Sequence, residues 1–198
     1  FIQSQFEGLD GIVVPGGFDS RGVEGKIAAI RYARENNVPF LGLCLGLQCA
    51  IIEFARNVCG LKNANSYEFS KKTEYPVINF VEGQKGLTKK SGTMRLGSYD
   101  CKIAENSIAY ILYGGDECSE RHRHRYEVNE EYVKVIEDKG LIASGRHPES
   151  NLVEIVELRG GFDHPFFMAT QAHPEFKSRL GKPSPLFLGL IESSIKHK

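Results

Sequence analysis

The alternation of apolar and polar residues predicts strands and helices in turn along the first third of the chain. Residues 10–14 end in the apolar run GIVV and precede Pro-Gly-Gly, which predicts a short strand followed by a turn. Apolar residues at three- and four-residue spacing predict a helix over residues 25–36. The run VPFLGL over residues 38–43 predicts a buried strand, and the spacing over residues 47–58 predicts an amphipathic helix.

The rest of the chain predicts further elements around a less regular middle. Residues 60–75 are expected to form a loop, and the other expected elements are strands over 77–81, 93–103, 152–158 and 166–171, and helices over 106–113, from 132 to Gly140, and from Ser184 to Ile195. The alternating order predicts one α/β domain over residues 1–198, with a doubly wound, mostly parallel sheet and helices on both faces. Ligands bind such sheets beyond the carboxyl ends of the strands.

Cys44 stands where the second strand turns into its helix, between Gly42 and Gly46. This is the pattern of a nucleophile elbow with Cys in place of Ser. The N–H groups and partial positive charge of the helix N-terminus favour a thiolate at this position. The alternative is a buried structural cysteine between two packing glycines.

A nucleophilic cysteine needs a base, and the base needs an orienting group. Among six histidines, His173 follows the strand over 166–171 and is expected at the same sheet edge as Cys44 if those strands are parallel. Glu175 stands two residues on, where its carboxylate can fix the imidazole tautomer. An ordinary surface turn is the alternative interpretation of this His-Pro-Glu.

Acyl transfer also needs N–H donors for the oxyanion. The backbone N–H of Leu45 is the donor that an elbow supplies, and Gly17 can supply a second from its loop. Glu68 could pair with an ammonium group, and an arginine of the run Arg121–Arg125 could clamp a carboxylate, although solvated surface is the usual role of such charges.

Composition limits the classes of function. The 198 residues carry 25 basic and 25 acidic side chains, so no extended nucleic-acid or anionic-membrane surface is expected. No apolar run approaches the roughly 20 residues of a membrane span, and no signal-peptide pattern is present. Five cysteines without paired spacing indicate a reducing compartment, so a cytoplasmic protein without a metal site is expected.

Several segments together resemble a known family. PGGF at 15–18, GLCLGLQ at 42–48, ERHRHRYEVN at 120–129 and HPEF at 173–176 are similar to the class I, triad-type glutamine amidotransferases, and in particular to the glutaminase domain of CTP synthase. The likeness runs from about residue 11 to the last helix. The elbow and HPE are general to the class, whereas RHRHRYEVN and the run RNVxGxxxANSxEF from Arg56 to Phe69 are narrower.

The resemblance implies roles for individual residues. Cys44 would be the nucleophile, His173 the general base and acid, and Glu175 its orienting group. Gly17 and Leu45 would form the oxyanion hole. The residues implied to hold L-glutamine are Gly17, Leu45, Gly46, Leu47, Gln48, Glu68 and Arg125.

The resemblance also implies what surrounds the domain. A synthetase domain in the same chain would use ATP and Mg²⁺ to aminate UTP to CTP, with GTP as activator and residues 83–97 as a lid near the effector. A homotetramer is implied. Family domains begin with a further strand and helix, so we expect a longer chain. Asp19 and Ala172 depart from the family pattern.

Two other functions stay open on sequence alone. A cysteine-dependent hydrolase of the DJ-1/PfpI type also carries its cysteine on an elbow, but it would give HPE, Glu68 and Arg125 no joint purpose. A non-catalytic regulatory domain is the third interpretation, although a degraded triad would be expected there.

Overall fold

The computed structural model describes residues 3–18, 20–80, 94–159 and 164–197, and two sheets organise this part of the chain. The larger sheet has the strand order β1-β2-β10-β9-β8-β5-β6, and a smaller one has the order β3-β4-β7. The strands of the larger sheet are β1 (Ile12–Val14), β2 (Phe40–Leu43), β10 (Phe167–Thr170), β9 (Val153–Leu158), β8 (Leu141–Arg146), β5 (Arg95–Ile103) and β6 (Glu117–His124). Those of the smaller sheet are β3 (Ala64–Ser66), β4 (Tyr75–Asn79) and β7 (Glu127–Val128).

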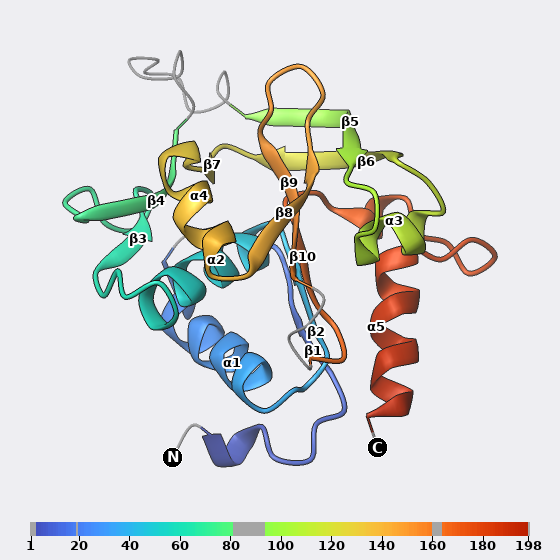
Figure 1. Ribbon diagram of the computed structural model, residues 1–198, viewed down its shortest axis with the longest axis horizontal. Coiled ribbons are helices and arrows are strands. Elements are labelled where there is room, and N and C mark those ends of the chain that lie inside the picture. The colour runs from blue at the N-terminus through green and yellow to red at the C-terminus, as the bar shows by residue number, and fades with distance from the viewer. Residues whose placement is uncertain (1–2, 19, 81–93, 160–163, 198) are drawn as a thin grey trace.

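Helices cover both faces of the larger sheet (Figure 1). One face carries α1 (Val23–Glu35), α2 (Leu45–Asn57) and α4 (Glu130–Asp138), and the other carries α3 (Ile108–Tyr113) and α5 (Pro185–Lys196). A separate apolar cluster fills the space on each side of the sheet. Short 3-10 turns occupy Gln3–Gln5 and Pro174–Phe176. The predicted α/β class, with helices on both faces of a sheet, is therefore confirmed.

The sheet is mixed, and its parallel part carries the predicted site. β1, β2 and β10 run parallel, whereas β9, β8, β5 and β6 join by antiparallel pairing. Short connections such as the one from β8 to β9 form hairpins, and hairpins pair antiparallel. Because β1, β2 and β10 end at one edge, the segments that follow them meet there.

The Arg-His run is a strand, which the sequence analysis did not predict. Within β6, His122 and His124 are buried while Arg121 and Arg123 are exposed, as the alternation of a half-buried strand requires. The interpretation as solvated surface therefore holds for these two arginines and is wrong for the histidines. The strand β8 was also missed.

Two other expected loops contain strands. β3 lies inside the expected loop 60–75 and pairs with β4. Arg95 and Gly97, expected in the lid, belong to β5. The rest of the expected lid, residues 83–93, and Asp19 lie outside the described residues.

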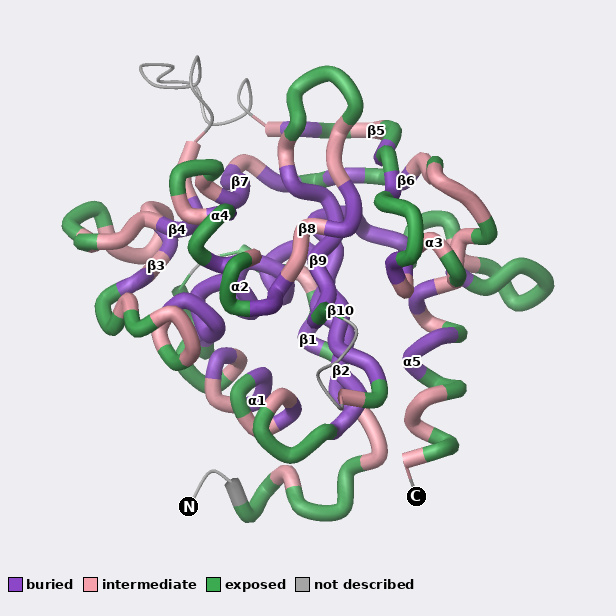
Figure 2. The backbone as a smooth tube through the Cα atoms, viewed as in Figure 1, coloured by how far each residue is buried: buried purple, intermediate pink, exposed green. Residues whose placement is uncertain are grey.

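Helix α2 is the most buried helix of the described chain (Figure 2). It contacts β1, β2 and β10 of the larger sheet, all three strands of the smaller sheet, and α1 and α4. Even Glu53 on this helix is fully buried, where its carboxylate accepts hydrogen bonds from Arg34 Nη2 at 2.7 Å and Nε at 3.0 Å. The helix that begins at Cys44 is thus held on all sides.

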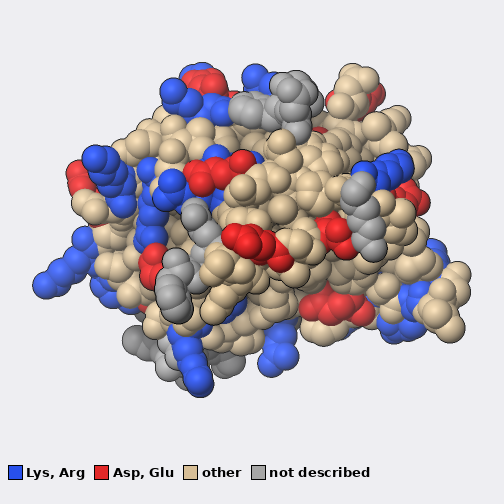
Figure 3. All heavy atoms as spheres, turned by 90° about the horizontal axis from the view of Figure 1, so that it is seen from below, with Lys and Arg blue, Asp and Glu red and all other residues tan. Residues whose placement is uncertain are grey.

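The surface agrees with the balanced charge of the sequence. Lys and Arg are interspersed with Asp and Glu on the face shown in Figure 3. No helix of the described residues is long and apolar enough to cross a membrane.

Candidate active site

Cys44 sits on a strained turn between β2 and α2. Its backbone has φ 51° and ψ −102°, a conformation that costs a residue with a side chain about 1–3 kcal/mol. Hydrogen bonds hold the turn, because the Cys44 N–H donates to Thr170 O at 2.7 Å and Cys44 O accepts from Gln48 N at 3.2 Å. The local geometry is that of a nucleophile elbow.

Both flanking glycines are required by close packing. A Cβ at Gly46 would lie 2.1 Å from Val14 O, and one at Gly42 would lie 2.8 Å from Gly46 C. Both obstacles are backbone atoms, which cannot rotate away. The glycines therefore let α2 begin directly against β1, with the thiol at its head.

His173 and Glu175 form a hydrogen-bonded pair at the same sheet edge. His173 Nδ1 lies 2.6 Å from Glu175 Oε1, and the imidazole stacks on Phe176 with ring centroids 5.0 Å apart. The two residues face each other as expected, but through the 3-10 turn Pro174–Phe176 rather than through an extended segment. Burial alone would raise the pKa of Glu175, but the hydrogen bond from His173 lowers it below its ordinary value.

Gly16 lies against both His173 and Cys44. A Cβ at this position would be 2.6 Å from His173 Cε1 and 3.5 Å from Cys44 Cβ. The loop after β1, the elbow after β2 and the segment after β10 thus converge on one point. This convergence follows from the parallel order of the three strands.

The environment of Cys44 favours the neutral thiol over the thiolate. Burial raises its pKa to about 12, although the backbone N–H of Leu45 acts in the opposite direction, and the carboxylates of Glu175, Glu127 and Glu68 raise it further. The helix N-terminus therefore acts in the expected direction, but it does not determine the pKa of this thiol. The loss of hydration in a site 3% exposed outweighs the N-terminal donors. A base must remove the proton.

Gly17 and Leu45, the residues expected to supply the oxyanion donors, lie next to each other. A Cβ at Gly17 would lie 3.3 Å from Leu45 Cδ2, so the loop after β1 passes directly over the start of α2. Two backbone N–H groups from different segments beside a nucleophile are the usual composition of an oxyanion hole.

A small pocket of about 60 Å³ opens beside the thiol. It is lined by Gly17, Phe18, Cys44, Gln48, Glu68, Met94, His124, Arg125 and Tyr126. Glu68 and Arg125, far apart in sequence, thus meet as opposite charges in one pocket with the thiol. Such a pocket suits a ligand that carries both an ammonium and a carboxylate group.

Not all residues implied for glutamine binding line this pocket. Leu45, Gly46 and Leu47 are buried beside it, and Leu47 belongs to the apolar core. Gln48 does line it, with Nε2 donating to Tyr126 O at 3.1 Å and to Gln171 Oε1 at 3.2 Å.

The sequence analysis missed four of the lining residues: Phe18, Met94, His124 and Tyr126. Phe18 and Tyr126 each adjoin a residue that the sequence analysis named. His124 could have been found from the alternation of buried and exposed positions in β6. Ala172, which departs from the family pattern, is buried with its N–H donating to Thr170 Oγ1. No three His, Cys, Asp or Glu side chains of the described residues come together as a metal site.

Comparison with protein families gives a match to the model "Glutamine amidotransferase class-I" over residues 2–193. The solved Trypanosoma brucei CTPS glutaminase domain with bound acivicin is similar over 98% of this chain and 74% of its own, with 41% identity and a TM-score of 0.88. The chain belongs to the class-I glutamine amidotransferases, as a glutaminase domain of the CTP synthase type.

Curated relatives agree with this membership. The chain is 59% identical to the CTP synthase of Methanococcus maripaludis over 190 residues and 58% identical to that of Methanocaldococcus jannaschii, covering 96% of this chain in both cases. It spans only 35% of the length of either relative. A solved glutamine amido transferase from Methylobacillus flagellatus shares the fold over 84% of this chain and 52% of its own, with 16% identity and a TM-score of 0.51.

Proposed function

We propose that this chain hydrolyses the side-chain amide of L-glutamine and releases ammonia, with Cys44 as nucleophile. The observation that supports the proposal most directly is the convergence of Cys44 and the His173–Glu175 pair beside a pocket with one acidic and one basic side chain. Arg125 would bind the α-carboxylate of glutamine and Glu68 its α-ammonium group. Gly17, Leu45, Gly46, Leu47 and Gln48 would complete the binding site.

The first half of the reaction forms a thioester. His173 Nε2 takes the thiol proton, and the sulfur attacks the amide carbon of glutamine. The backbone N–H groups of Leu45 and Gly17 stabilise the oxyanion of the tetrahedral intermediate. His173 then gives the proton to the leaving nitrogen, and ammonia departs from a γ-glutamyl thioester.

The second half regenerates the thiol. His173 takes a proton from water, and the resulting hydroxide attacks the thioester carbon. Collapse of the second tetrahedral intermediate releases glutamate, and the sulfur leaves and recovers the proton from His173. Glu175 stays ionised throughout, because its lowered pKa keeps it available to stabilise the imidazolium.

We further propose that the chain is one part of a CTP synthase. Its ammonia would pass to a synthetase domain of the same polypeptide, which would use ATP and Mg²⁺ to aminate UTP to CTP, with GTP as activator. The relatives named CTP synthase, of which this chain spans 35%, support this context. A cytoplasmic location and a homotetramer accompany the proposal.

The experiment compares two sources of nitrogen in the full-length protein. Cys44→Ala is expected to abolish CTP formation from glutamine and to retain CTP formation from added ammonium. Cys49→Ala is the matched control, because Cys49 is a buried core thiol on the same helix. Glutamine-dependent synthesis that survives in Cys44→Ala would refute the nucleophile.

A labelling experiment separates glutamine hydrolysis from the other interpretations. An electrophilic glutamine analogue is expected to modify Cys44, as located by peptide mass spectrometry, and free glutamine should protect it. Labelling that glutamine does not reduce would favour a hydrolase with another substrate, and absence of labelling would favour a non-catalytic domain.

A further inference from the structure

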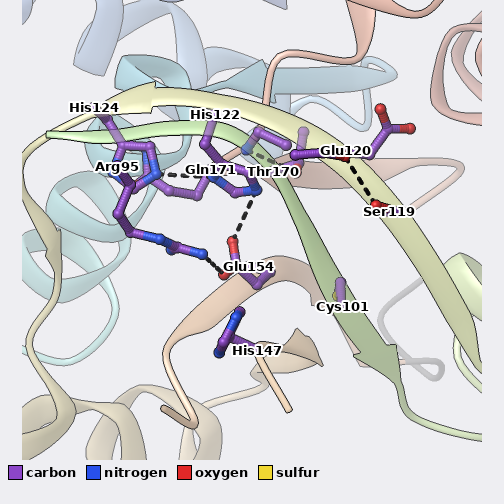
Figure 4. A network of polar contacts seen from close by, with 12 residues as sticks. Arg95, Cys101, Ser119, Glu120, His122, His124, His147, Glu154, Thr170 and Gln171 are labelled. Atoms are coloured by element: carbon purple, nitrogen blue, oxygen red, sulfur yellow. Dashed lines mark hydrogen bonds and ion pairs between the residues drawn. The ribbon is translucent and has the colours of Figure 1, made fainter. Parts of the chain in front are cut away.

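A buried polar network contains Arg95, Glu154, His122 and His124 (Figure 4). Arg95 donates from Nη2 to Glu154 Oε1 at 2.7 Å and from Nη1 to Glu127 Oε1 at 3.3 Å. His122 and His124 complete the network, with ring nitrogens 2.9 Å apart. The side chains of both histidines and both glutamates are only 2% exposed. The network reaches the pocket through His124, one of the lining residues.

The hydrogen bonds determine where the imidazole protons lie. His124 Nδ1 is 3.2 Å from Tyr126 O, and a carbonyl oxygen can only accept, so Nδ1 carries the proton. Burial lowers the pKa of His124 to about 3, so the ring is neutral and its Nε2 is an acceptor. His122 Nδ1, at 2.9 Å from this nitrogen, must therefore be the donor. His122 is also neutral, because burial lowers its pKa to about 2, which leaves its Nε2 as an acceptor.

This acceptor faces an oxygen of Glu154. His122 Nε2 lies 3.5 Å from Glu154 Oε2, a buried atom that has no hydrogen-bond partner among the described residues. A carboxylate oxygen and a bare imidazole nitrogen repel each other, whereas a protonated carboxyl oxygen donates to that nitrogen. A proton on Glu154 Oε2 removes this repulsion.

The balance of charge leads to the same result. Arg95 contributes one positive charge, and Glu127 and Glu154 would contribute two negative charges if both were ionised. Burial raises the pKa of Glu127 to about 8 and also raises that of Glu154. Glu127 Oε1 accepts from Arg95 Nη1 at 3.3 Å, and this cation opposes the effect of burial on the pKa of Glu127. One further proton therefore makes the network neutral. The raised pKa values do not distinguish Glu127 from Glu154 as its site, but Glu154 is the carboxyl group that faces the bare nitrogen of His122.

The other neighbours of His122 do not provide a negative charge that would stabilise an imidazolium. The Tyr99 ring packs on Arg95, with the guanidinium carbon 4.3 Å from the ring centroid, and on His122. His147 and His173 are the other titratable groups that act on His122, and a positive charge on either would disfavour an imidazolium there.

We propose that Glu154 is a buried protonated acid, and that its O–H, through His122 and His124, positions the segment that binds glutamine. His124 Nδ1 donates a hydrogen bond to Tyr126 O, which also accepts one from Gln48 Nε2. Arg125 lies between His124 and Tyr126 in the chain, so these hydrogen bonds fix the backbone on both sides of it. Glu154 and His122 are thus positioning residues for the Arg125 side of the pocket. The predicted effect on glutamine binding rests on the proposed function, whereas the protonation of Glu154 is independent of it.

Substitution by an amide tests the protonation state of Glu154. In Glu154→Gln the side-chain nitrogen can donate to His122 Nε2 and the oxygen can accept from Arg95, which reproduces the pattern of the protonated acid. The variant is expected to fold as the wild type does and to keep the KM for glutamine within about twofold. Glu154→Ala loses both bonds, and its KM is expected to rise at least about tenfold, with a smaller change in kcat.

Glu157→Gln is the matched control on the same strand. Glu157 is equally buried, but its two oxygens accept from the backbone N–H groups of Ile108 at 2.7 Å and Ala109 at 3.1 Å. In Glu157→Gln the amide NH₂ group would face one of these backbone N–H donors, so this variant is expected to lose stability. If Glu154→Gln is destabilised as much as Glu157→Gln, Glu154 is ionised and the proposal is wrong.

The pH dependence of unfolding gives a readout that does not need activity. A group whose pKa is raised on folding stabilises the fold below its unfolded pKa and loses that effect as pH rises through the folded pKa. The ratio of folding constants, wild type over Glu154→Gln, is therefore expected to fall by up to about tenfold per pH unit above pH ~5. A ratio that does not depend on pH between 5 and 8 would overturn the proposal.

NMR of ¹⁵N-labelled histidine covers the case in which Glu154→Ala does not fold. Both His122 and His124 of the wild type are expected as neutral Nδ1–H tautomers at pH 7, and an Nε2–H tautomer at His122 would refute the proton on Glu154. If the wild type releases no ammonia from glutamine, the proposed function fails, and the unfolding and NMR results still decide the protonation state.

Discussion

Gly16→Ala is expected to disable the site by adding one methyl group between base and nucleophile. The new Cβ would lie 2.6 Å from His173 Cε1, so the ring must retreat by about 0.8 Å to reach the ordinary contact distance of 3.4 Å. The backbone at Gly16 does not have the positive φ that would itself disfavour alanine. The effect therefore acts on the imidazole.

The imidazole has little freedom to retreat. It is held on one side by Glu175 at 2.6 Å and stacks on Phe176. A misplacement of about 1 Å in a catalytic geometry can cost about 100-fold in rate, or about 2.7 kcal/mol in the transition state. We expect kcat to fall by roughly this factor. The overpacked site should also lose about 1–3 kcal/mol of folding stability.

The assay is steady-state release of ammonia from glutamine, with urea unfolding of the same preparations to establish that the variant is folded. Gly25→Ala is the control, since its Cβ meets nothing within 4 Å. It is expected to keep wild-type activity and to gain up to about 1 kcal/mol of helix stability. A folded Gly16→Ala variant with kcat within about threefold of wild type would refute the assigned contact between loop, base and thiol.

Three further predictions follow from the burial and charge of individual side chains. The rate at which iodoacetamide alkylates Cys44, measured on the Cys44 peptide by mass spectrometry, should rise about tenfold per pH unit from pH ~7 to ~10. The reason is that the pKa of the thiol is raised to about 12, so only the small thiolate fraction reacts. A rate that reaches a plateau below pH ~9 would contradict this. Arg34→Ala should lose about 3–5 kcal/mol of stability in urea unfolding, because it leaves Glu53 buried without its cation, whereas Arg31→Ala, which breaks an exposed pair on the same helix, should lose less than about 1 kcal/mol. Equal losses would show that burial does not govern the Arg34–Glu53 pair. Glu68→Gln should raise the KM for glutamine about 10- to 100-fold with little change in kcat, and a loss of kcat at constant KM would contradict an ammonium-binding role.

The elbow and its partners could be predicted from sequence because short-range patterns encode them. Strand-to-helix periodicity located Cys44, and the turn after β1 and the HPE segment were expected at the ends of strands. Three parallel strands then bring these segments together. The convergence therefore needed only the correct class of fold.

The polar half of the site could not be predicted in the same way. Pairing of β5 with β6 places Arg95 opposite His124, and no local pattern encodes a register between segments this far apart. The alternation of Arg and His over residues 121–125 could have indicated a half-buried strand, but the density of positive charge favoured interpretation as solvated surface. The protonation state of Cys44 also depended on burial by distant elements, which the helix-terminus argument did not contain.

The electrostatic role of the network follows from its position near the thiol. Glu127 is among the carboxylates that raise the pKa of Cys44, so uncompensated negative charge behind the pocket opposes formation of the thiolate. A proton on Glu154 leaves Arg95 to compensate Glu127, which is the carboxylate of the network that acts on the pKa of Cys44. A proton on His124 would instead place a cation in the pocket wall next to Arg125. In the proposed arrangement the neutral network would leave the ionisation of the thiol to proton transfer to His173, and glutamine would meet a pocket whose opposite charges come from Glu68 and Arg125.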